Sequence, residues 1–262
     1  IVGYANGTTN ANAIVSANNG IFKSGGDMLI SGSTPNGTNV YAIQLTNTAL
    51  YSGGKLTMQG ATTSSLSAQN GGLVGTTIVN VATTVAGAAV NGGTQHGIYI
   101  NGTAVITYNG STYSDNVASG NIWVAATTGT SAGAYYGIYD YSAFTSTNGS
   151  ITLIGSTGGV NGLGVNLQAT AHVIAQNATN GYIYIYGTNT STSGGDGVNI
   201  VGNTALAPHA FDAGKNLVIS GYANGTSGAN SVYVTTYTLF KSGGDLAISG
   251  STPRGTNSYG MY

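Results

Sequence analysis

A long internal repeat constrains the fold more than any other feature of this sequence. Residues 1–44 match residues 219–262 at a fixed offset of 218, with 25 identical positions that include the GYANGT, FKSGGD and ISGSTP segments. A repeat of this kind predicts a repetitive architecture rather than an ordinary globular domain. We expect a segment of a longer polypeptide, in which residues 1–218 form one period and residues 219–262 begin the next. Residues 1–262 would then form a single continuous unit without domain boundaries.

A shorter theme recurs inside the long period, with a mean length of about 31 residues. It reads apolar-x-apolar-x-Gly, then Gly-apolar-x-apolar, then Thr-Ala, as in the stretch from Ile151 to Ala171. These units begin near Asp27, Lys55, Thr83, Asn121, Ser150, Tyr182, Asn216 and Asp245. Residues 1–218 are therefore predicted to hold seven units, and the whole chain roughly eight.

Each unit contains three short segments in which apolar and polar residues alternate, which is typical of half-buried strands. Gly-Gly and Asn-Gly pairs separate the segments and are expected to supply turns with positive φ. Three strands and three turns per unit predict one coil of a parallel β-helix, also called a β-solenoid. At about 4.8 Å per coil, seven coils would extend about 34 Å.

Equivalent residues of stacked coils should form columns that face the core. The first predicted inward column is Met28, Leu56, Ile122, Ile151, Ile183, Leu217 and Leu246. The second is Ile30, Met58, Val124, Leu153, Ile185, Ile219 and Ile248. An aliphatic, dry and narrow core is expected. A β-sandwich would not require this recurring theme, and a β-propeller blade usually takes about 40 residues or more.

The scarcity of charge fits stacked coils. Charged side chains make up only 4% of the chain, and the formal net charge is −1. A charge repeated along a column would repel its own copies, whereas Asn, Ser and Thr can bond to the same residue type in the next coil. Lys23 with Asp27, and Lys241 with Asp245, are predicted to pair across their Ser-Gly-Gly turns.

The composition also excludes several classes of protein. A nearly neutral chain lacks the basic surface that nucleic-acid binding requires. No apolar run is long enough to span a membrane as a helix. The chain has no cysteine, which excludes disulfides and thiolate metal sites.

The repeats resemble those of large filamentous-haemagglutinin-like adhesins, which are bacterial two-partner-secreted or related surface exoproteins. The resemblance lies in the I-x-L-x-G to T-A theme, as in Ile151 to Ala171, and covers most of the chain. It implies a right-handed parallel β-helical shaft, secretion to the cell surface, and a role in adhesion or biofilm formation. The secretion domain of that family is not visible in these residues. The mean unit is longer than that family's tight coils, which leaves room for projecting turns.

Two kinds of candidate surface residue emerge. Tyr99, Tyr139, Tyr184 and Tyr233 occupy outward positions on predicted strands, where they suit contacts between fibres or sugar binding, although Tyr is also simply favoured in strands. Asn-x-Ser/Thr sequons that suit surface glycosylation include Asn6, Asn36, Asn101 and Asn224.

No catalytic or metal site is expected. The three histidines, His96, His172 and His209, do not share a repeat position, whereas zinc needs three or four converging ligands. Asp140 replaces an aliphatic residue of the theme, and a distorted turn is predicted there rather than catalysis on polysaccharide.

The sequence therefore predicts the structural shaft of an extracellular filament or adhesin, neither an enzyme nor a cofactor-binding protein. Its expected partners are its own continuation end to end and other shafts laterally. The alternative is a module that binds surface glycans or another partner through projecting turns and tyrosine columns.

Overall fold

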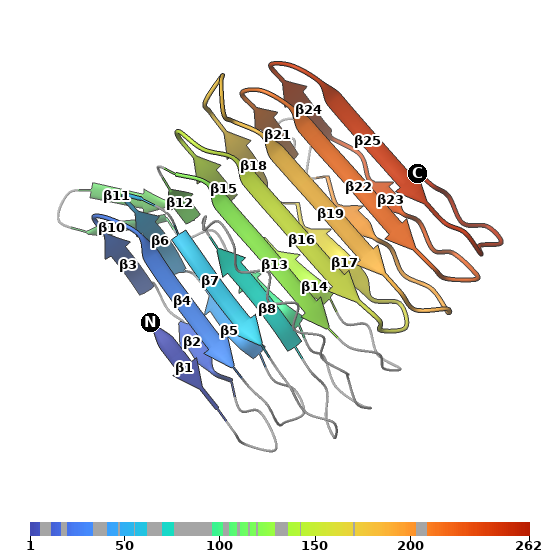
Figure 1. Ribbon diagram of the computed structural model, residues 1–262, viewed down its shortest axis with the longest axis horizontal. Coiled ribbons are helices and arrows are strands. Elements are labelled where there is room, and N and C mark those ends of the chain that lie inside the picture. The colour runs from blue at the N-terminus through green and yellow to red at the C-terminus, as the bar shows by residue number, and fades with distance from the viewer. Residues whose placement is uncertain are drawn as a thin grey trace.

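The structure is a computed structural model in which every regular element is a β-strand (Figure 1). It describes residues 1–5, 12–16, 20–33, 41–46, 48–54, 56–61, 70–75, 96–101, 105–108, 111–114, 116–118, 120–128, 136–141, 143–169, 171–202 and 209–262. No helix occurs in these ranges.

The strands form three long sheets, and the chain visits them in turn. Sheet 1 contains β1 (Val2–Tyr4), β4 (Met28–Ser33), β7 (Leu56–Ala61), β8 (Asn70–Gly75), β13 (Ile122–Thr128), β16 (Ile151–Thr157), β19 (Ile183–Asn189), β22 (Leu217–Ala223) and β25 (Leu246–Ser251). Sheet 2 contains β2 (Ile14–Ser16), β5 (Tyr41–Thr46), β9 (His96–Asn101), β14 (Tyr136–Asp140), β17 (Leu163–Leu167), β20 (Val198–Ile200) and β23 (Val232–Val234). Sheet 3 contains β3 (Gly20–Ser24), β6 (Thr48–Ser52), β12 (Asn116–Ala118), β15 (Ala143–Ser146), β18 (His172–Ala175), β21 (His209–Ala213) and β24 (Thr238–Ser242).

All strand pairs within the three sheets are parallel except those that involve β8. One strand from each sheet makes one circuit of the chain, and successive circuits stack along the sheets (Figure 1). The predicted parallel β-solenoid with three strands per coil is therefore confirmed.

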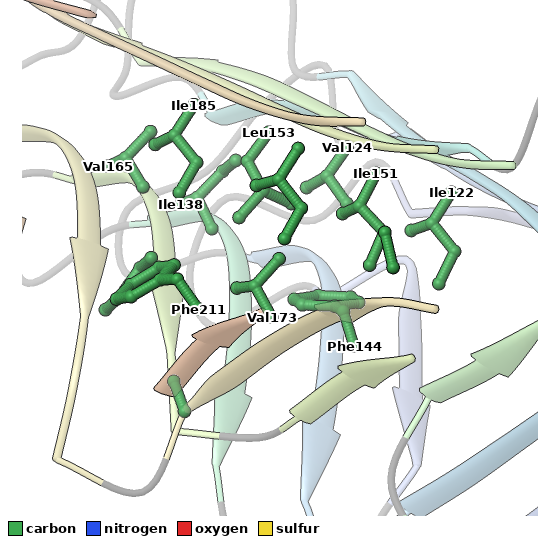
Figure 2. Packing of buried hydrophobic residues seen from close by; sticks show 14 of the residues in the cluster. Ile122, Val124, Ile138, Phe144, Ile151, Leu153, Val165, Val173, Ile185 and Phe211 are labelled. Carbon is green, nitrogen blue, oxygen red and sulfur yellow. The ribbon is translucent and has the colours of Figure 1, made fainter. Parts of the chain in front are cut away.

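The predicted inward columns are confirmed by the strand register. In the first column, successive members pair directly from Met28 through Leu56 and Ile122 to Leu246. Leu246 lies in the last strand of the sheet and is 51% exposed, so burial of this predicted core residue is not confirmed. In the second column, Val124 begins an unbroken series of pairs that ends at Ile248. The side chains of these columns between β13 and β22 are at most 1% exposed, and they face the other two sheets (Figure 2).

The core is less aliphatic than predicted, because sheet 3 supplies aromatic rings. Phe144 and Phe211 are completely buried and lie opposite the sheet 1 column, with Val173 between them in the register (Figure 2). Phe211 also stacks on Phe240 of the next coil, with ring centroids 5.2 Å apart. The sheet 3 segments vary more between units than the I-x-L-x-G segments, so their contribution was not predicted.

Glycine recurs in the sheet 1 strands for a different reason from the predicted one. At Gly155, Gly187 and Gly221, a Cβ atom would overlap a backbone carbonyl group where the chain enters the next strand of sheet 2. Only Gly195 and Gly228, among the described glycines, have φ in the left-handed region, at 93° and 61°. The theme therefore needs glycine mainly because two backbones meet closely at the corner between sheets 1 and 2.

Between β7 and β13, the strands β9 and β12 continue sheets 2 and 3, but β8 and a hairpin are added to the regular coil. Leu56 pairs with Ile122 across a long excursion of the chain, and β8 lies between the two strands in an antiparallel direction. A hairpin of β10 (Val105–Tyr108) and β11 (Ser111–Ser114) belongs to the same insertion. The unit start predicted near Thr83 lies outside the described residues.

This insertion changes the coil count. Ile14 in β2 and Val232 in β23 occupy equivalent positions in the two copies of the repeat, and six strand-to-strand steps separate them along sheet 2. On sheet 3, six strand-to-strand steps also separate β3 from its copy β24. On sheet 1, seven steps separate β1 from its copy β22, but one of them is due to the inserted strand β8. For the described strands, the period therefore holds six full coils rather than seven, which is about 29 Å at 4.8 Å per step.

The two copies of the repeat fold in the same way. In β1 and β4, Val2 pairs with Ser31. In their copies β22 and β25, the equivalent residues Ser220 and Ser249 pair with each other. The structure thus assigns the same register to both copies of the sequence.

Candidate functional site

Three of the four predicted surface tyrosines share one outward column on sheet 2. Tyr99 pairs with Tyr139, which pairs with Asn166. Asn166 pairs with Asn199, and Asn199 pairs with Tyr233. The structure therefore makes Tyr99 and Tyr139 direct neighbours and places two asparagines between Tyr139 and Tyr233.

The two asparagines form a short amide ladder that sequence reasoning missed. Asn199 donates through Nδ2 to Oδ1 of Asn166 at 3.1 Å, and Gln168 donates through Nε2 to the same oxygen at 2.7 Å. Oδ1 of Asn199 is buried without a hydrogen-bond partner. The next residue of the column is Tyr233, which carries no amide to extend the ladder. The shared GVN tripeptide at residues 164–166 and 197–199 could have indicated this pair.

Tyr139 belongs to a cluster of three rings on one edge of β14. Its ring stacks on Tyr136 at a centroid distance of 5.0 Å and meets Tyr141 edge-on at 5.2 Å. The hydroxyl oxygens of Tyr139 and Tyr141 are 2.7 Å apart, which is a hydrogen bond in which either group can donate. Burial, together with the nearby Tyr141 hydroxyl, raises the pKa of Tyr136 above 10.0. The Tyr136 hydroxyl is therefore neutral at physiological pH.

Tyr233 belongs to a second cluster, whose other members were not predicted. Its ring lies parallel to that of Tyr262 at a centroid distance of 5.2 Å, and Tyr259 contacts Tyr262 at the same distance. Both partners lie in the second copy of the repeat, where the first copy has Tyr41 and Gln44. The two tyrosine clusters of sheet 2 are thus not copies of each other.

Tyr184 lies on a different face from the other three tyrosines. It is the middle ring of a row along β19, 5.7 Å from Tyr182 and 6.3 Å from Tyr186, and the three rings are nearly parallel. Lys215 lies over the Tyr182 ring at 5.1 Å, and a hydrogen bond to Tyr182 raises the pKa of this lysine. Partial burial and the two neighbouring tyrosines raise the pKa of Tyr184. The row is therefore an aromatic ridge with a cation at one end.

The predicted glycosylation sites are only partly described. Asn6 and Asn36 lie outside the described residues. Asn101 is the last residue of β9, and Asn224 directly follows β22. Asn224 is half-buried and donates through Nδ2 to the carbonyl oxygen of Thr190 at 3.5 Å. Glycosylation at these residues stays a prediction.

The histidines and acidic residues form no metal site in the part of the chain that the structure describes. His172 accepts a hydrogen bond from the Ala210 backbone N–H through Nδ1 at 3.1 Å, and partial burial lowers the pKa of this histidine. Lys241 binds Asp212 of the preceding coil at 2.8 Å, rather than Asp245 across its own turn as predicted. The stacking of coils, rather than proximity in sequence, therefore determines which carboxylate Lys241 binds.

Asp140 is not part of a distorted turn, contrary to the prediction. It ends the regular strand β14, where it pairs with Ile100 on one side and Leu167 on the other. Its side chain is completely buried in an inward column. The substitution of an aliphatic residue by a carboxyl group is therefore a feature of the core rather than of a turn.

Comparison with known proteins gives no relative from which a site could be transferred. No protein-family model matches the chain, and no curated protein or solved structure matches it either. Among the described elements, none is a helix that could cross a membrane. The features of this chain that bear on function are therefore its coil architecture and its two tyrosine-bearing faces.

Proposed function

We propose that this chain is part of the structural shaft of a repetitive filament or adhesin on a microbial cell surface, where it supports adhesion or contact between cells. One observation carries the proposal: the end of one 218-residue period and the beginning of the next stack as ordinary coils of a single solenoid. Such a junction allows periods to be added without a break in any of the three sheets.

The junction is in register on each sheet. On sheet 1, Ile183 in the first period pairs with Leu217, and β22 continues directly into the second period. On sheet 2, Val198 pairs with Val232. On sheet 3, Asp212 pairs with Lys241, and their side chains form an ion pair at 2.8 Å across the junction. Inward positions at the junction, such as Ile219, are completely buried.

The location outside the cell is supported by the resemblance of the repeats to filamentous-haemagglutinin-like surface exoproteins. A nearly uncharged, repetitive and elongated fold suits a passive spacer, because it offers stiffness without requiring a chemical site. The same composition, with 44 glycines and 4% charged residues, follows from the stacking of coils.

The shaft proposal is tested with chains that contain one, two and three tandem periods. Particle length, measured by electron microscopy and small-angle X-ray scattering, should increase by about 29 Å for each added period. A matched control inserts a flexible Gly-Ser segment of about 15 residues at the junction and should give jointed rather than straight rods. Particles that become rounder as periods are added would contradict the proposal. Labelling of intact source cells by an antibody against the chain tests its location.

The outward column of sheet 2 favours a second function, the binding of surface glycans. The half-buried Tyr139 and Tyr233 combine apolar ring faces with hydroxyl groups, which is how proteins hold neutral sugars, whereas Asn166 between them is buried. Replacement of Tyr139 and Tyr233 by asparagine, the residue of the intervening coils, should abolish glycan-array binding. Binding that survives both changes would exclude this column as the glycan site.

A further inference from the structure

The longest corner between sheets 3 and 1 lies between β18 and β19. Among the described strands, the other connections from sheet 3 to sheet 1 contain three or four residues, whereas this one contains seven, residues 176–182. Its backbone closes through a hydrogen bond from the Gly181 N–H to the carbonyl oxygen of Asn177 at 2.6 Å. Ala178, Thr179 and Asn180 in this turn are exposed. The extra residues therefore form a turn that stands out from the shaft, beyond the shorter corners of the neighbouring coils.

This turn presents an Asn-x-Ser/Thr sequon, formed by Asn177, Ala178 and Thr179. The Oδ1 atom of Asn177 accepts hydrogen bonds from the backbone N–H groups of Thr179 and Asn180, both at 2.8 Å. The Nδ2 atom of Asn177 donates to no described residue and is open to solvent. The hydroxyl group of Thr179 has no hydrogen-bond partner among the described residues either. The amide nitrogen and the hydroxyl group that define a glycosylation sequon are thus both available.

The sequons at Asn189 and Asn224, by contrast, are used by the fold. Asn189 is completely buried, and its Nδ2 atom donates to two backbone carbonyl oxygens at 2.7 and 2.9 Å. A sugar on this nitrogen would replace one of the two hydrogen bonds and would need space inside the solenoid. In the sequon of Asn224, the Thr226 hydroxyl group donates to a backbone carbonyl oxygen of the preceding coil at 3.0 Å. An enzyme that reads this hydroxyl group must first break its hydrogen bond.

The sequon at Asn148 is available only in part. Asn148 is exposed, and its Nδ2 atom donates to Oγ1 of Thr147 at 3.4 Å. Ser150 completes the sequon, but its backbone N–H and its hydroxyl group both donate to Oδ1 of Asn121 in the preceding coil, at 2.9 and 3.4 Å. Among the four sequons that lie wholly within the described residues, Asn177 therefore has the only one that combines a free amide nitrogen with a free hydroxyl group.

We propose that Asn177 is the attachment site of an N-linked glycan. The donor would be a sugar activated as a diphosphate and brought by a transferase of the source cell. A bond forms between Nδ2 of Asn177 and the anomeric carbon, the bond from that carbon to the diphosphate breaks, and the amide loses one proton as the diphosphate leaves. The reaction does not consume Oδ1, so both hydrogen bonds of the turn remain after attachment.

The proposal rests on the proposed function, because a chain on the cell surface is the kind of protein that carries such sugars. It also adds to that function. Each 218-residue period would carry a glycan at the same corner of the solenoid, so glycans on tandem periods would lie about 29 Å apart in one row along the shaft.

The acceptor is tested in vitro on the folded full-length chain, produced in a host without N-glycosylation. The chain is incubated with a sequon-specific N-glycosyltransferase and a nucleotide-activated hexose, and peptide mass spectrometry follows each sequon with time. Asn177 should be modified at least about tenfold faster than Asn148, Asn189 and Asn224, because those sequons must first open locally. In a peptic digest of the same chain, this preference for Asn177 should largely disappear, since no fold protects the other sequons.

Variants of the turn separate attachment of the sugar from an effect on the fold. Asn177→Asp keeps an oxygen that accepts the two turn hydrogen bonds but removes the amide nitrogen, and Thr179→Ala removes only the hydroxyl group. Both variants should stay folded, as circular dichroism verifies, and should lose the modification at residue 177. The matched control Thr179→Ser keeps a hydroxyl group and should retain the modification.

Equal modification rates of the four sequons in the folded chain would overturn the proposal. So would an unmodified Asn177 in chains recovered from the surface of source cells, where a glycan on this residue is the expected result. The second outcome would leave the shaft proposal intact, because particle length does not depend on the glycan. Rods that fail to lengthen with added periods would overturn the shaft proposal and leave the acceptor assignment unchanged, so the two failures are distinguishable.

Discussion

Replacing Gly187 with alanine should destabilise the solenoid strongly. The added Cβ would overlap the carbonyl group of Gly197 and lie 2.6 Å from Cγ2 of Val198. Neither backbone can move away freely, since β19 pairs with β16 on one side and β22 on the other, and the Gly197 N–H is bound to Asn230 at 3.0 Å. We therefore expect a loss at the upper end of the overpacking range, about 3 kcal/mol of unfolding free energy.

The matched control is Gly26→Ala, which adds the same methyl group where nothing lies within 4 Å and φ is not in the left-handed region. This change should be neutral or stabilise by about 0.5 kcal/mol through the unfolded chain. Urea unfolding followed by circular dichroism measures both variants. On a thermal scale the Gly187 variant should melt about 6–12 °C lower than wild type.

Equal stabilities of the Gly187 and Gly26 variants would refute the reasoning. Such a result would mean that the corner between sheets 1 and 2 is wide enough for a side chain. The recurrence of glycine in the theme would then need a conformational explanation instead.

Two further predictions concern the core and its pH dependence. Phe211→Ala should cost about 3–5 kcal/mol in urea unfolding, clearly more than Phe240→Ala, because Phe211 is completely buried and Phe240 only partly; equal costs would contradict this. Because burial lowers the pKa of folded His172, its contribution to stability is complete above the usual value of 6.5 and is lost as pH falls through the lower folded pKa. His172→Gln should therefore reduce the loss of unfolding free energy between neutral and acidic pH, as measured by urea unfolding. If the variant loses as much unfolding free energy in acid as wild type does, the prediction is wrong.

The columns of sheet 1 were predictable because two independent periodicities agree there. Alternation identifies which side chains of a strand face inward, and the repeat identifies which strands are equivalent. Together they assign Ile151 and Ile183 to one column from the amino-acid sequence alone, and the two residues pair directly. Where both signals are strong, the register follows from the sequence.

The direction of β8 was not predictable, because alternation reads the same in both chain directions. Residues 70–75 form a strand, but an alternating pattern does not distinguish parallel from antiparallel pairing. The internal repeat did not indicate the direction of β8 either, because β8 lies in the part of the chain where the repeat is least regular. The coil count was therefore one too high for the described strands.

The face of the strand on which each tyrosine lies could be predicted, but the residues that each tyrosine contacts could not. The face depends only on alternation along one strand, whereas the stacking of Tyr233 on Tyr262 depends on which residue the next coil presents. The ion pair has the same origin: Lys241 lies close to Asp245 in sequence, yet stacking brings Asp212 to its amino group. Short sequence separation is a poor guide to contacts when each coil lies on the next.

Contacts between coils also explain the unusual composition. At one corner, Oδ1 of Asp196 accepts a hydrogen bond from the Asn230 backbone N–H, and Oδ1 of Asn230 accepts one from the Tyr259 N–H of the following coil. An amide can repeat this contact in every coil because it is neutral, whereas a carboxylate repeated about every 4.8 Å would meet its own charge. Burial raises the pKa of Asp196, so even a single carboxyl is less readily ionised in this position. A solenoid that holds its corners through such contacts must therefore be rich in asparagine and poor in charge.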